Sequence, residues 1–394
     1  MIVGPNDPAS PDDPASPDDP ASPDDPASPD DPASPDDPAS PDDTPKERVA
    51  GEPVRSTGGS IGPGGLTAVA LGGGHGLYAT LSAVRMLASD VTAVVTVADD
   101  GGSSGRLRNE LGMLPPGDLR MALAALSGDE PRTRMWADVM QHRFGGSGAL
   151  AGHSVGNLIL AGLTEVLGDT VLALDEAARL LGIAGRVVPM APIPLDIEAD
   201  VSGLEDDPRV SRVIRGQVAV ATTPGKVRRV RLMPPDPPAT PEAVAAIEAA
   251  DLVVLGPGSW FSSVIPHVLV PELLAALHRS TAQKVLVLNL APELGETTGF
   301  SAERHLHVLS QHAPDFRVDH IVVDSAFVPR GGERDHLARA AARLGADVVY
   351  VDVAESGSHT HHFGKLAAAL GSIVTSGGGT AEDVPHREGI TSWP

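Results

Sequence analysis

The sequence predicts an α/β protein with a doubly wound, mainly parallel β-sheet and a small β-rich insert. Residues 66–71 and 91–97 form apolar runs with the composition of buried strands, and residues 77–87 between them have helical spacing. These three segments make a β-α-β unit, and further strands alternate with helices along the chain. Because right-handed crossovers bring the ends of parallel strands to one edge, we expect ligand-binding loops at that edge.

The remaining elements follow in order. The predicted helices are residues 118–127, 132–143, 157–167, 171–181, 241–250 and 269–277. The predicted strands of the main sheet are residues 251–255, 284–289, 320–324 and 347–353. Short β-type runs at residues 186–189, 217–222 and 227–232 are separated by proline, glycine and charges, which predicts the antiparallel insert at about residues 185–235. We expect one folded domain at residues 66–375 that contains this insert.

The negative charge of the chain is concentrated in its first fifty residues. The 394 residues carry a formal net charge of -23. Residues 1–50 contain fourteen acidic and two basic residues, a net of -12, which leaves -11 for the other 344 residues. A mildly acidic folded part has no basic footprint for nucleic acid. The sequence has no cysteine, which excludes disulfides, thiol nucleophiles and cysteine-based zinc sites.

Six copies of Asp-Pro-Ala-Ser-Pro-Asp run from Asp7 to Asp42. Proline removes backbone donors and aspartates repel one another, so we expect residues 1–65 to be a disordered acidic tail and linker. An interaction or spacing arm is the alternative to a solvating repeat. Residues 376–394 are predicted to be a flexible C-terminal tail. Signal-peptide features are absent and no apolar run approaches about 20 residues, so we expect a cytoplasmic protein without a membrane span.

A glycine-rich turn directly follows the first predicted strand. The pattern Gly74-x-Gly76-x-x-Ala79 fits the dinucleotide-binding motif in its strand–turn–helix context. Glycine lets the backbone approach phosphate oxygens, and the helix N-terminus supplies free N–H groups. A tight turn that only requires glycine is the structural alternative. The candidate ligand-binding residues of this turn are Gly72, Gly73, Gly74, His75 and Gly76.

Two adjacent carboxylates, Asp99 and Asp100, end the second predicted strand. An acid here meets ribose hydroxyls in nucleotide-binding units, and two acids together can hold Mg²⁺. An Asx turn or a helix cap is the structural alternative. Residues 101–105 form a candidate second anion cradle, and the two arginines that follow can neutralise phosphate or form surface salt bridges. Besides the aspartates, the candidates are Gly101, Gly102, Ser103, Ser104, Arg106 and Arg108.

Two further segments combine polar side chains with the start of a predicted helix. Asp118 is predicted to cap its helix, and Arg120 opposes the helix dipole unless it faces an anion. For His153, Ser154 and Asn157 we favour hydrogen bonds to a sugar or phosphate, with a helix cap by Ser154 as the alternative. A catalytic serine is disfavoured because the strand–nucleophile–helix elbow is missing, and no catalytic residue is predicted.

A second glycine turn follows the strand at residues 251–255 and is also suited to anions. An asparagine ends the next strand and can hydrogen-bond to an amide or hydroxyl. The candidates are Gly256, Gly258, Ser259 and Asn289. We expect this turn, the asparagine and Asp99 to face one cleft. Three histidines within residues 359–362 have metal-like content, but a solvated cluster is the favoured interpretation.

In this order, these segments resemble the YvcK-type gluconeogenesis factor proteins of the CofD-like family. The resemblance covers residues 66 to about 365. It adds Thr297 to the ligand-binding candidates. His75 departs from the threonine usual in the family, and the acidic repeat is not a family feature. The residues that carry the resemblance are Gly72-Gly-Gly-His-Gly76, Ala98-Asp-Asp-Gly-Gly-Ser-Ser-Gly-Arg-Leu-Arg108, Pro115-Pro-Gly-Asp-Leu-Arg120, Gly152-His-Ser-Val-Gly-Asn157, Gly256-Pro-Gly-Ser259 and Gly295-Glu-Thr297.

The resemblance implies a Rossmann-like core and a cytosolic regulatory protein that binds a nucleotide sugar of the UDP-N-acetylglucosamine type. It implies a role that links carbon metabolism to cell-envelope precursor supply and cell shape, with a protein partner; a homo-oligomer is left open. The related CofD branch instead transfers phospholactate to a deazaflavin alcohol with Mg²⁺. The loop at residues 99–106 resembles the regulatory branch. An NAD-dependent oxidoreductase, indicated by the Gly74 pattern alone, ranks last.

Overall fold

The computed structural model describes residues 65–376 except 208, 294 and 329. The predicted tails at residues 1–64 and 377–394 lie outside the described residues. Within this part of the chain, no single helix has the length and apolarity of a membrane span. One bent pair, Trp260–Leu269 with Pro271–Arg279, meets those two requirements when both helices are counted together.

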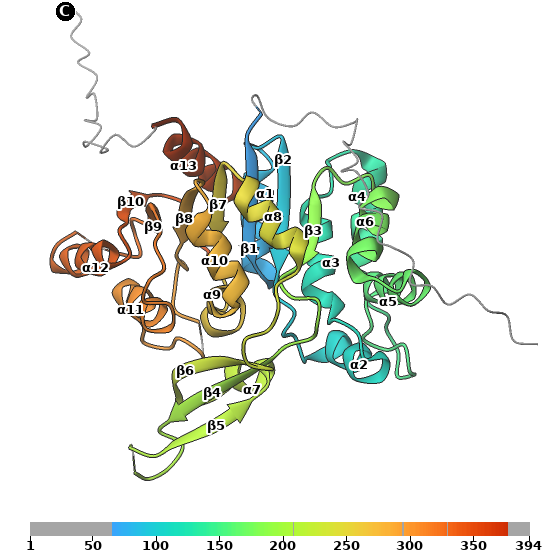
Figure 1. Ribbon diagram of the computed structural model, residues 1–394, viewed down its shortest axis with the longest axis horizontal. Helices are drawn as coiled ribbons and strands as arrows, with labels where there is room; N and C mark the ends of the chain where they lie inside the picture. The colour runs from blue at the N-terminus through green and yellow to red at the C-terminus, as the bar shows by residue number, and fades with distance from the viewer. Residues whose placement is uncertain (1–64, 208, 294, 329, 377–394) are drawn as a thin grey trace, which may run out of the picture. The chain divides into compact units, whose positions relative to one another are not determined.

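The main sheet has seven parallel strands in the order β10-β9-β8-β7-β1-β2-β3 (Figure 1). This confirms the predicted Rossmann-like, doubly wound architecture. The strand order reverses between β1 and β7, so these two strands define the topological switch point of the sheet. The strands are β1 Thr67–Gly72, β2 Asp90–Val95, β3 Arg186–Pro189, β7 Leu252–Leu255, β8 Gln283–Val287, β9 His320–Asp324 and β10 Asp347–Val351.

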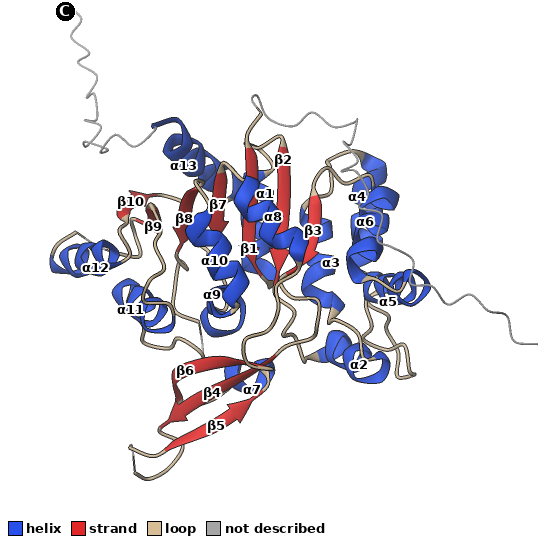
Figure 2. Cartoon of the chain, in the orientation of Figure 1, coloured by secondary structure: helices blue, strands red, loops and turns tan. Residues whose placement is uncertain are grey.

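Helices cover both faces of this sheet (Figure 2). The central strands β1 and β7 are buried along almost their whole length, as strands covered on both faces must be. Helix α1 packs with α3 and α13, whereas α8 packs with α10. The helices are α1 Gly74–Val84, α2 Gly102–Leu111, α3 Pro116–Ala125, α4 Pro131–Gln141, α5 Val155–Leu167, α6 Thr170–Leu181, α7 Gln217–Ala221, α8 Pro241–Ala249, α9 Ile265–Leu269, α10 Pro271–Arg279, α11 Ala302–His312, α12 Gly332–Arg343 and α13 Phe363–Ser376, with the π-helical turn η1 Trp260–Val264 before α9.

The insert is a three-stranded antiparallel sheet in the order β5-β4-β6, made of β4 Asp196–Ser202, β5 Ser211–Arg215 and β6 Lys226–Met233. Two parts of the sequence prediction need correction. Residues 186–189 are not in the insert but form β3, which pairs in parallel with β2 because Val187 and Val188 are buried at the edge of the main sheet. Residues 217–222 are not a strand, since α7 begins there after Gly216.

The insert is fastened to α2 by charged side chains. Arg108 of α2 donates to the backbone oxygen of Leu195 at 3.0 Å and forms an ion pair with Asp196 at the start of β4. Arg215 of β5 binds the other carboxylate oxygen of Asp196 at 2.7 Å. Asp196 therefore joins α2 to two strands of the insert.

Substituting Gly76→Ala should destabilise the protein by about 3 kcal/mol, because a Cβ at this position would overlap the backbone carbonyl of Pro257. Chemical denaturation measures the change. The matched control is Gly162→Ala in α5, where nothing lies within 4 Å of the added Cβ; it should stabilise by up to about 1 kcal/mol through helix propensity. Equal effects of the two substitutions would contradict the close approach at Gly76.

Candidate functional site

The glycine turns after β1 and β7 meet at the switch point. Leu71 pairs with Leu255, and the Gly256 amide donates to the Leu71 carbonyl at 3.0 Å. Asn289 after β8 holds the second turn, because its side chain accepts from the Gly258 amide at 2.7 Å and donates to the Gly258 carbonyl at 2.9 Å. The structure therefore brings together three predicted segments, although both polar groups of Asn289 are engaged by backbone.

The N-terminus of α1 lies beside a carboxyl group from another helix. Gly73 is the N-cap of α1 and provides no side-chain cap, and the Gly74 amide hydrogen-bonds to Asp118 of α3. Burial raises the pKa of Asp118 to about 7, and the nearby Asp99 carboxylate adds to this rise. The predicted capping role of Asp118 is wrong, because Pro115 is the N-cap of α3 and Asp118 lies in its first turn. Asp118 instead lies beside the start of α1, where its partner is the Gly74 amide.

Asp99 and Asp100 have separate partners. Asp99 accepts a hydrogen bond from the Gly101 amide at 3.0 Å, which is an Asx-type turn. Asp100 accepts from the Val218 amide at 2.9 Å and thus caps α7 of the insert. These bonds engage one oxygen of each carboxylate, and Mg²⁺ at Asp99 and Asp100 stays a prediction. No cluster of three or more histidine, aspartate or glutamate side chains suited to a metal occurs among the residues described by the structure.

The predicted anion cradle at residues 101–105 lies at the N-terminus of α2, with Gly101 as the N-cap, and its anion-binding role stays a prediction. Ser103, Ser104 and Gly105 are buried in its first turn. Gly105 packs against the Asp100 backbone and Gly117 packs against Ser104, so neither glycine has room for a Cβ. The small residues of this segment therefore serve the packing of α2 and α3 on the loop at residues 99–100.

A chain of buried polar side chains connects α2, α3, α4 and the start of α5. His153 Nδ1 lies 2.9 Å from Ser103 Oγ, which accepts a hydrogen bond from Asn157 Nδ2 at 3.0 Å. Arg120 Nε donates to Asn157 Oδ1 at 2.9 Å, and Arg120 also bonds to Gln141. Nothing in the sequence indicated Gln141, because its role follows only from the packing of α4 on α3.

Within this network, the surroundings of His153 favour its neutral form, and Arg120 has no ion-pair partner among the described residues. Burial and the nearby Arg106 lower the pKa of His153. Burial, followed by repulsion from Arg143, lowers the pKa of Arg120 to about 10. Arg120 bonds to amide oxygens, and no ion pair to it is found within the described part of the chain. Its guanidinium therefore leaves positive potential close to Asp118 and Asp99.

Arg106 and Arg108 point to different parts of the protein. Arg106 donates to the backbone oxygens of Ala151 at 2.8 Å and Ala149 at 3.4 Å, and it has no carboxylate partner among the described side chains. Arg108 is the ion-pair partner of Asp196 described above. Of these two arginines, Arg106 is the one whose charge remains uncompensated.

The remaining predicted residues differ in their surroundings. Ser154 is the N-cap of α5 but its buried hydroxyl makes no capping bond and finds no partner in the described structure. Thr297 is buried and its hydroxyl accepts from the Glu293 amide at 2.8 Å. His75 is exposed beside the first glycine turn. His361 is buried, and burial lowers its pKa to about 4.

Sequence reasoning missed Glu296, a buried carboxyl next to the second glycine turn. Glu296 accepts from the Phe261 amide at 3.0 Å and from the Ser259 hydroxyl at 2.5 Å. Burial raises the pKa of Glu296 to about 8 and also raises the pKa of its neighbour Glu293. Ser259 is therefore held by a carboxyl that carries a proton at neutral pH.

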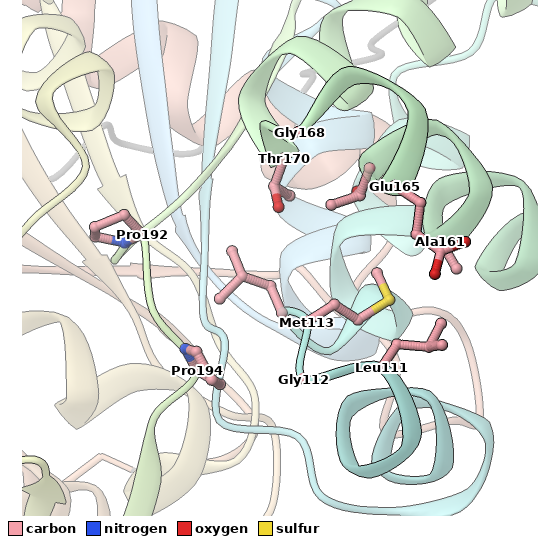
Figure 3. Close-up of a pocket in the computed structure, with 11 residues that line it drawn as sticks. Leu111, Gly112, Met113, Ala161, Glu165, Gly168, Thr170, Pro192 and Pro194 are labelled. Carbon is pink, nitrogen blue, oxygen red and sulfur yellow. The ribbon is translucent and has the colours of Figure 1, made fainter. Parts of the chain in front are cut away.

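One pocket, of about 360 Å³, lies away from all of these groups (Figure 3). It is formed by the end of α2, by α5 and by two prolines of the loop after β3. None of the predicted site residues lines it, and Glu165 is its one charged lining side chain. We therefore place the candidate site at the switch point. By "switch-point site" we mean the turns at residues 72–76 and 256–259 together with Asp99 and Asp118.

The fold and this site define a doubly wound α/β protein with glycine turns and carboxyl groups at the reversal of its strand order. The chain belongs to the CofD family, whose sequence pattern, described as 2-phospho-L-lactate transferase CofD, matches residues 68–362. The predicted resemblance is confirmed at this level.

Relatives with known names support the same assignment. Over 314 residues the chain is 67% identical to the "Putative gluconeogenesis factor" of Mycobacterium tuberculosis, covering 80% of this chain and 92% of the relative. The "Gluconeogenesis factor" of Bacillus subtilis is 39% identical over 277 residues, covering 70% and 84% of the two chains. A crystal structure of a UPF0052-family protein from Bacillus halodurans matches with a TM-score of 0.68 at 34% identity, covering 78% of this chain and 99% of that one.

The raised pKa of Asp118 predicts a pH-dependent stability. A carboxyl with an ordinary pKa of 3.8 and a folded pKa of about 7 contributes stability that is present below pH 3.8 and is lost as the pH rises through 7. Asp118→Asn should therefore change the free energy of unfolding more favourably at pH 8 than at pH 5, and the difference between the two pH values should be about 2 kcal/mol. Denaturation at the two pH values measures this difference. Asp129→Asn, at an exposed carboxylate, is the control; an equal response of both variants would refute the burial of charge at Asp118.

Proposed function

We propose that this protein is a cytoplasmic regulatory protein that binds a UDP-sugar of the UDP-N-acetylglucosamine type. The observation that carries this proposal is the meeting of two glycine turns beside the N-terminus of α1 at the reversal of the strand order. A diphosphate suits backbone amides at a helix N-terminus, and ligands of open α/β sheets bind at this point of the strand order. The remaining oxygen of Asp99 suits a ribose hydroxyl.

The charges near the site support an anionic ligand. Arg106 has backbone partners but no carboxylate partner among the described side chains, and Arg120 is buried among neutral amides. Asp118 carries a proton for much of the time at neutral pH, so it repels a phosphate less than an ordinary aspartate would. These two guanidinium groups, which have no carboxylate partner among the described residues, support an anionic ligand.

The biological role in the proposal extends the names of the relatives. Those names concern gluconeogenesis, and we propose that binding of the UDP-sugar links carbon metabolism to cell-envelope precursor supply and cell shape through a protein partner. The Ser103 hydroxyl, 2.9 Å from His153 Nδ1, is buried and accepts a hydrogen bond from Asn157, which gives no support to a serine nucleophile at this position. Its hydroxyl is held by the fold rather than presented to a ligand.

UDP-N-acetylglucosamine should raise the melting temperature of the full chain. At a hundredfold excess over the Kd, mass action stabilises the folded state by about 3 kcal/mol. Arg106→Ala should weaken the affinity by about tenfold or more because it removes a cation that no carboxylate neutralises. Thermal shift and calorimetric titration give the two readings.

The matched control is Arg132→Ala, at an exposed arginine in the first turn of α4. It should leave both the melting temperature and the UDP-sugar affinity unchanged. Absence of any thermal shift with the parent protein would refute the proposed ligand. A loss of affinity in both arginine variants would instead point to a general effect of net charge.

Phospholactate transfer is the second candidate function, and the family match over residues 68–362 is the observation that favours it. The chain would then form product from a phospholactyl nucleotide and a deazaflavin alcohol. Chromatography of the reaction mixture tests this directly. Product that depends on Asp99 would establish turnover, whereas UDP-sugar binding without product would support the regulatory role.

A further inference from the structure

A second pocket lies between the insert and the segment that leads into α11. Its volume is about 690 Å³, within the range of small-molecule sites. One wall is the turn before β6 and the first residues of that strand, and the other is the loop at residues 295–301 with the start of α11. Neither the first glycine turn, nor Asp99, nor Asp118 contributes to its lining.

Three cationic side chains line this pocket: Lys226 and Arg228 from β6 and Arg304 from α11. Arg228 donates through Nε to Ser202 Oγ at 2.7 Å, which orients its guanidinium. The Arg304 guanidinium lies over the Phe300 ring at 5.6 Å from its centroid. Among the described residues, the Lys226 side chain has no hydrogen bond and none of the three side chains has an ion-pair partner. The three cations therefore line one pocket without a carboxylate partner among the described residues.

The acidic groups nearby do not cancel this charge. Glu296 lines the pocket but is only 3% exposed, and its oxygens are engaged by the Phe261 amide and the Ser259 hydroxyl. Burial raises its pKa to about 8, so it is protonated at neutral pH. Glu303 precedes Arg304 in α11, and its Oε2 atom lies 4.0 Å from His336 Nδ1 of α12. The Glu303 carboxylate is therefore directed toward α12 and not toward the pocket. The N-terminus of α11 adds the positive end of its dipole to the same wall.

We propose that this pocket, which adjoins the switch-point site through the bond between Glu296 and Ser259, is a second binding site for a small phosphorylated molecule whose phosphate contacts Lys226, Arg228 and Arg304. A phosphate group suits the three cations better than a single carboxylate, because its oxygens can accept several charge-assisted hydrogen bonds at once. The remaining volume accommodates an organic group beside the Phe300 ring and the Thr223–Pro224–Gly225 turn.

Calorimetric titration of the full chain with inorganic pyrophosphate tests this site. The parent protein should bind pyrophosphate at millimolar or lower concentration, with an affinity that falls as salt is added. The double variant Lys226→Gln/Arg304→Gln should lose about tenfold or more in affinity. Lys226 is exposed and Arg304 is half-buried, and circular dichroism should show that the fold is unchanged. Arg229→Gln, on the same strand but outside the pocket, is the matched control and should bind like the parent.

Three outcomes would overturn the proposal. The first is no heat of binding with the parent protein at millimolar pyrophosphate. The second is an equal loss in Arg229→Gln and the double variant, which would indicate only the general charge of the insert. The third is loss of pyrophosphate binding in Arg106→Ala or its competition by UDP-N-acetylglucosamine, which would place the anion at the switch-point site. Because pyrophosphate is measured without any UDP-sugar, failure of the proposed UDP-sugar function leaves this test intact.

Discussion

The rest of the candidate site depends on the backbone-to-backbone contact between the turns after β1 and β7. Gly76 lies so close to the Pro257 carbonyl that no side chain fits between them, and Asn289 fixes the second turn from the next strand. This contact sets the direction in which α1 leaves the sheet. It therefore also sets where the N-terminus of α1, Asp118 and Asp99 lie relative to one another.

The protein also buries a connected set of polar side chains between α2, α3, α4 and the start of α5. His153, Ser103, Asn157 and Arg120 are each at most 5% exposed and are joined end to end by hydrogen bonds. A buried guanidinium is costly unless its donors are satisfied, and the amides of Asn157 and Gln141 satisfy part of that requirement. A network of this kind fixes four helix ends in one arrangement, which suits a site that must be preorganised.

The sequence predicted the main sheet well because its strands are short apolar runs with helices between them, and burial on both faces produces that pattern. The sequence predicted less well where the same residue types occur in more than one kind of element, such as an insert strand, a main-sheet strand or a helix. Residues 186–189 have the composition of an insert strand but complete the main sheet, because an edge position beside β2 is decided by packing. Three of the six residues at positions 217–222 are β-branched, yet the segment is a helix whose first turn is bound by the Asp100 carboxylate. Long-range contacts of this kind leave no local signal.

For the site, the glycine turns were predictable because their spacing and context follow from backbone geometry. The partners of individual side chains were not. The sequence grouped Arg106 with Arg108, but their bonds to Ala151 and Asp196 separate them. Gln141 carried no signal, and Glu296 was quoted only as part of the Gly295–Thr297 segment, because burial and neighbours give both residues their roles.

The divergence of Asp99 and Asp100 has a mechanical consequence. One carboxylate lies beside the start of α1, and the next residue along the chain holds the first turn of α7 in the insert. The peptide bond between Asp99 and Asp100 therefore couples the two sheets. A tilt of the antiparallel sheet moves Asp100 and so turns the backbone of the preceding residue, Asp99. The insert is in this sense part of the support of the glycine turns rather than an appendage to them.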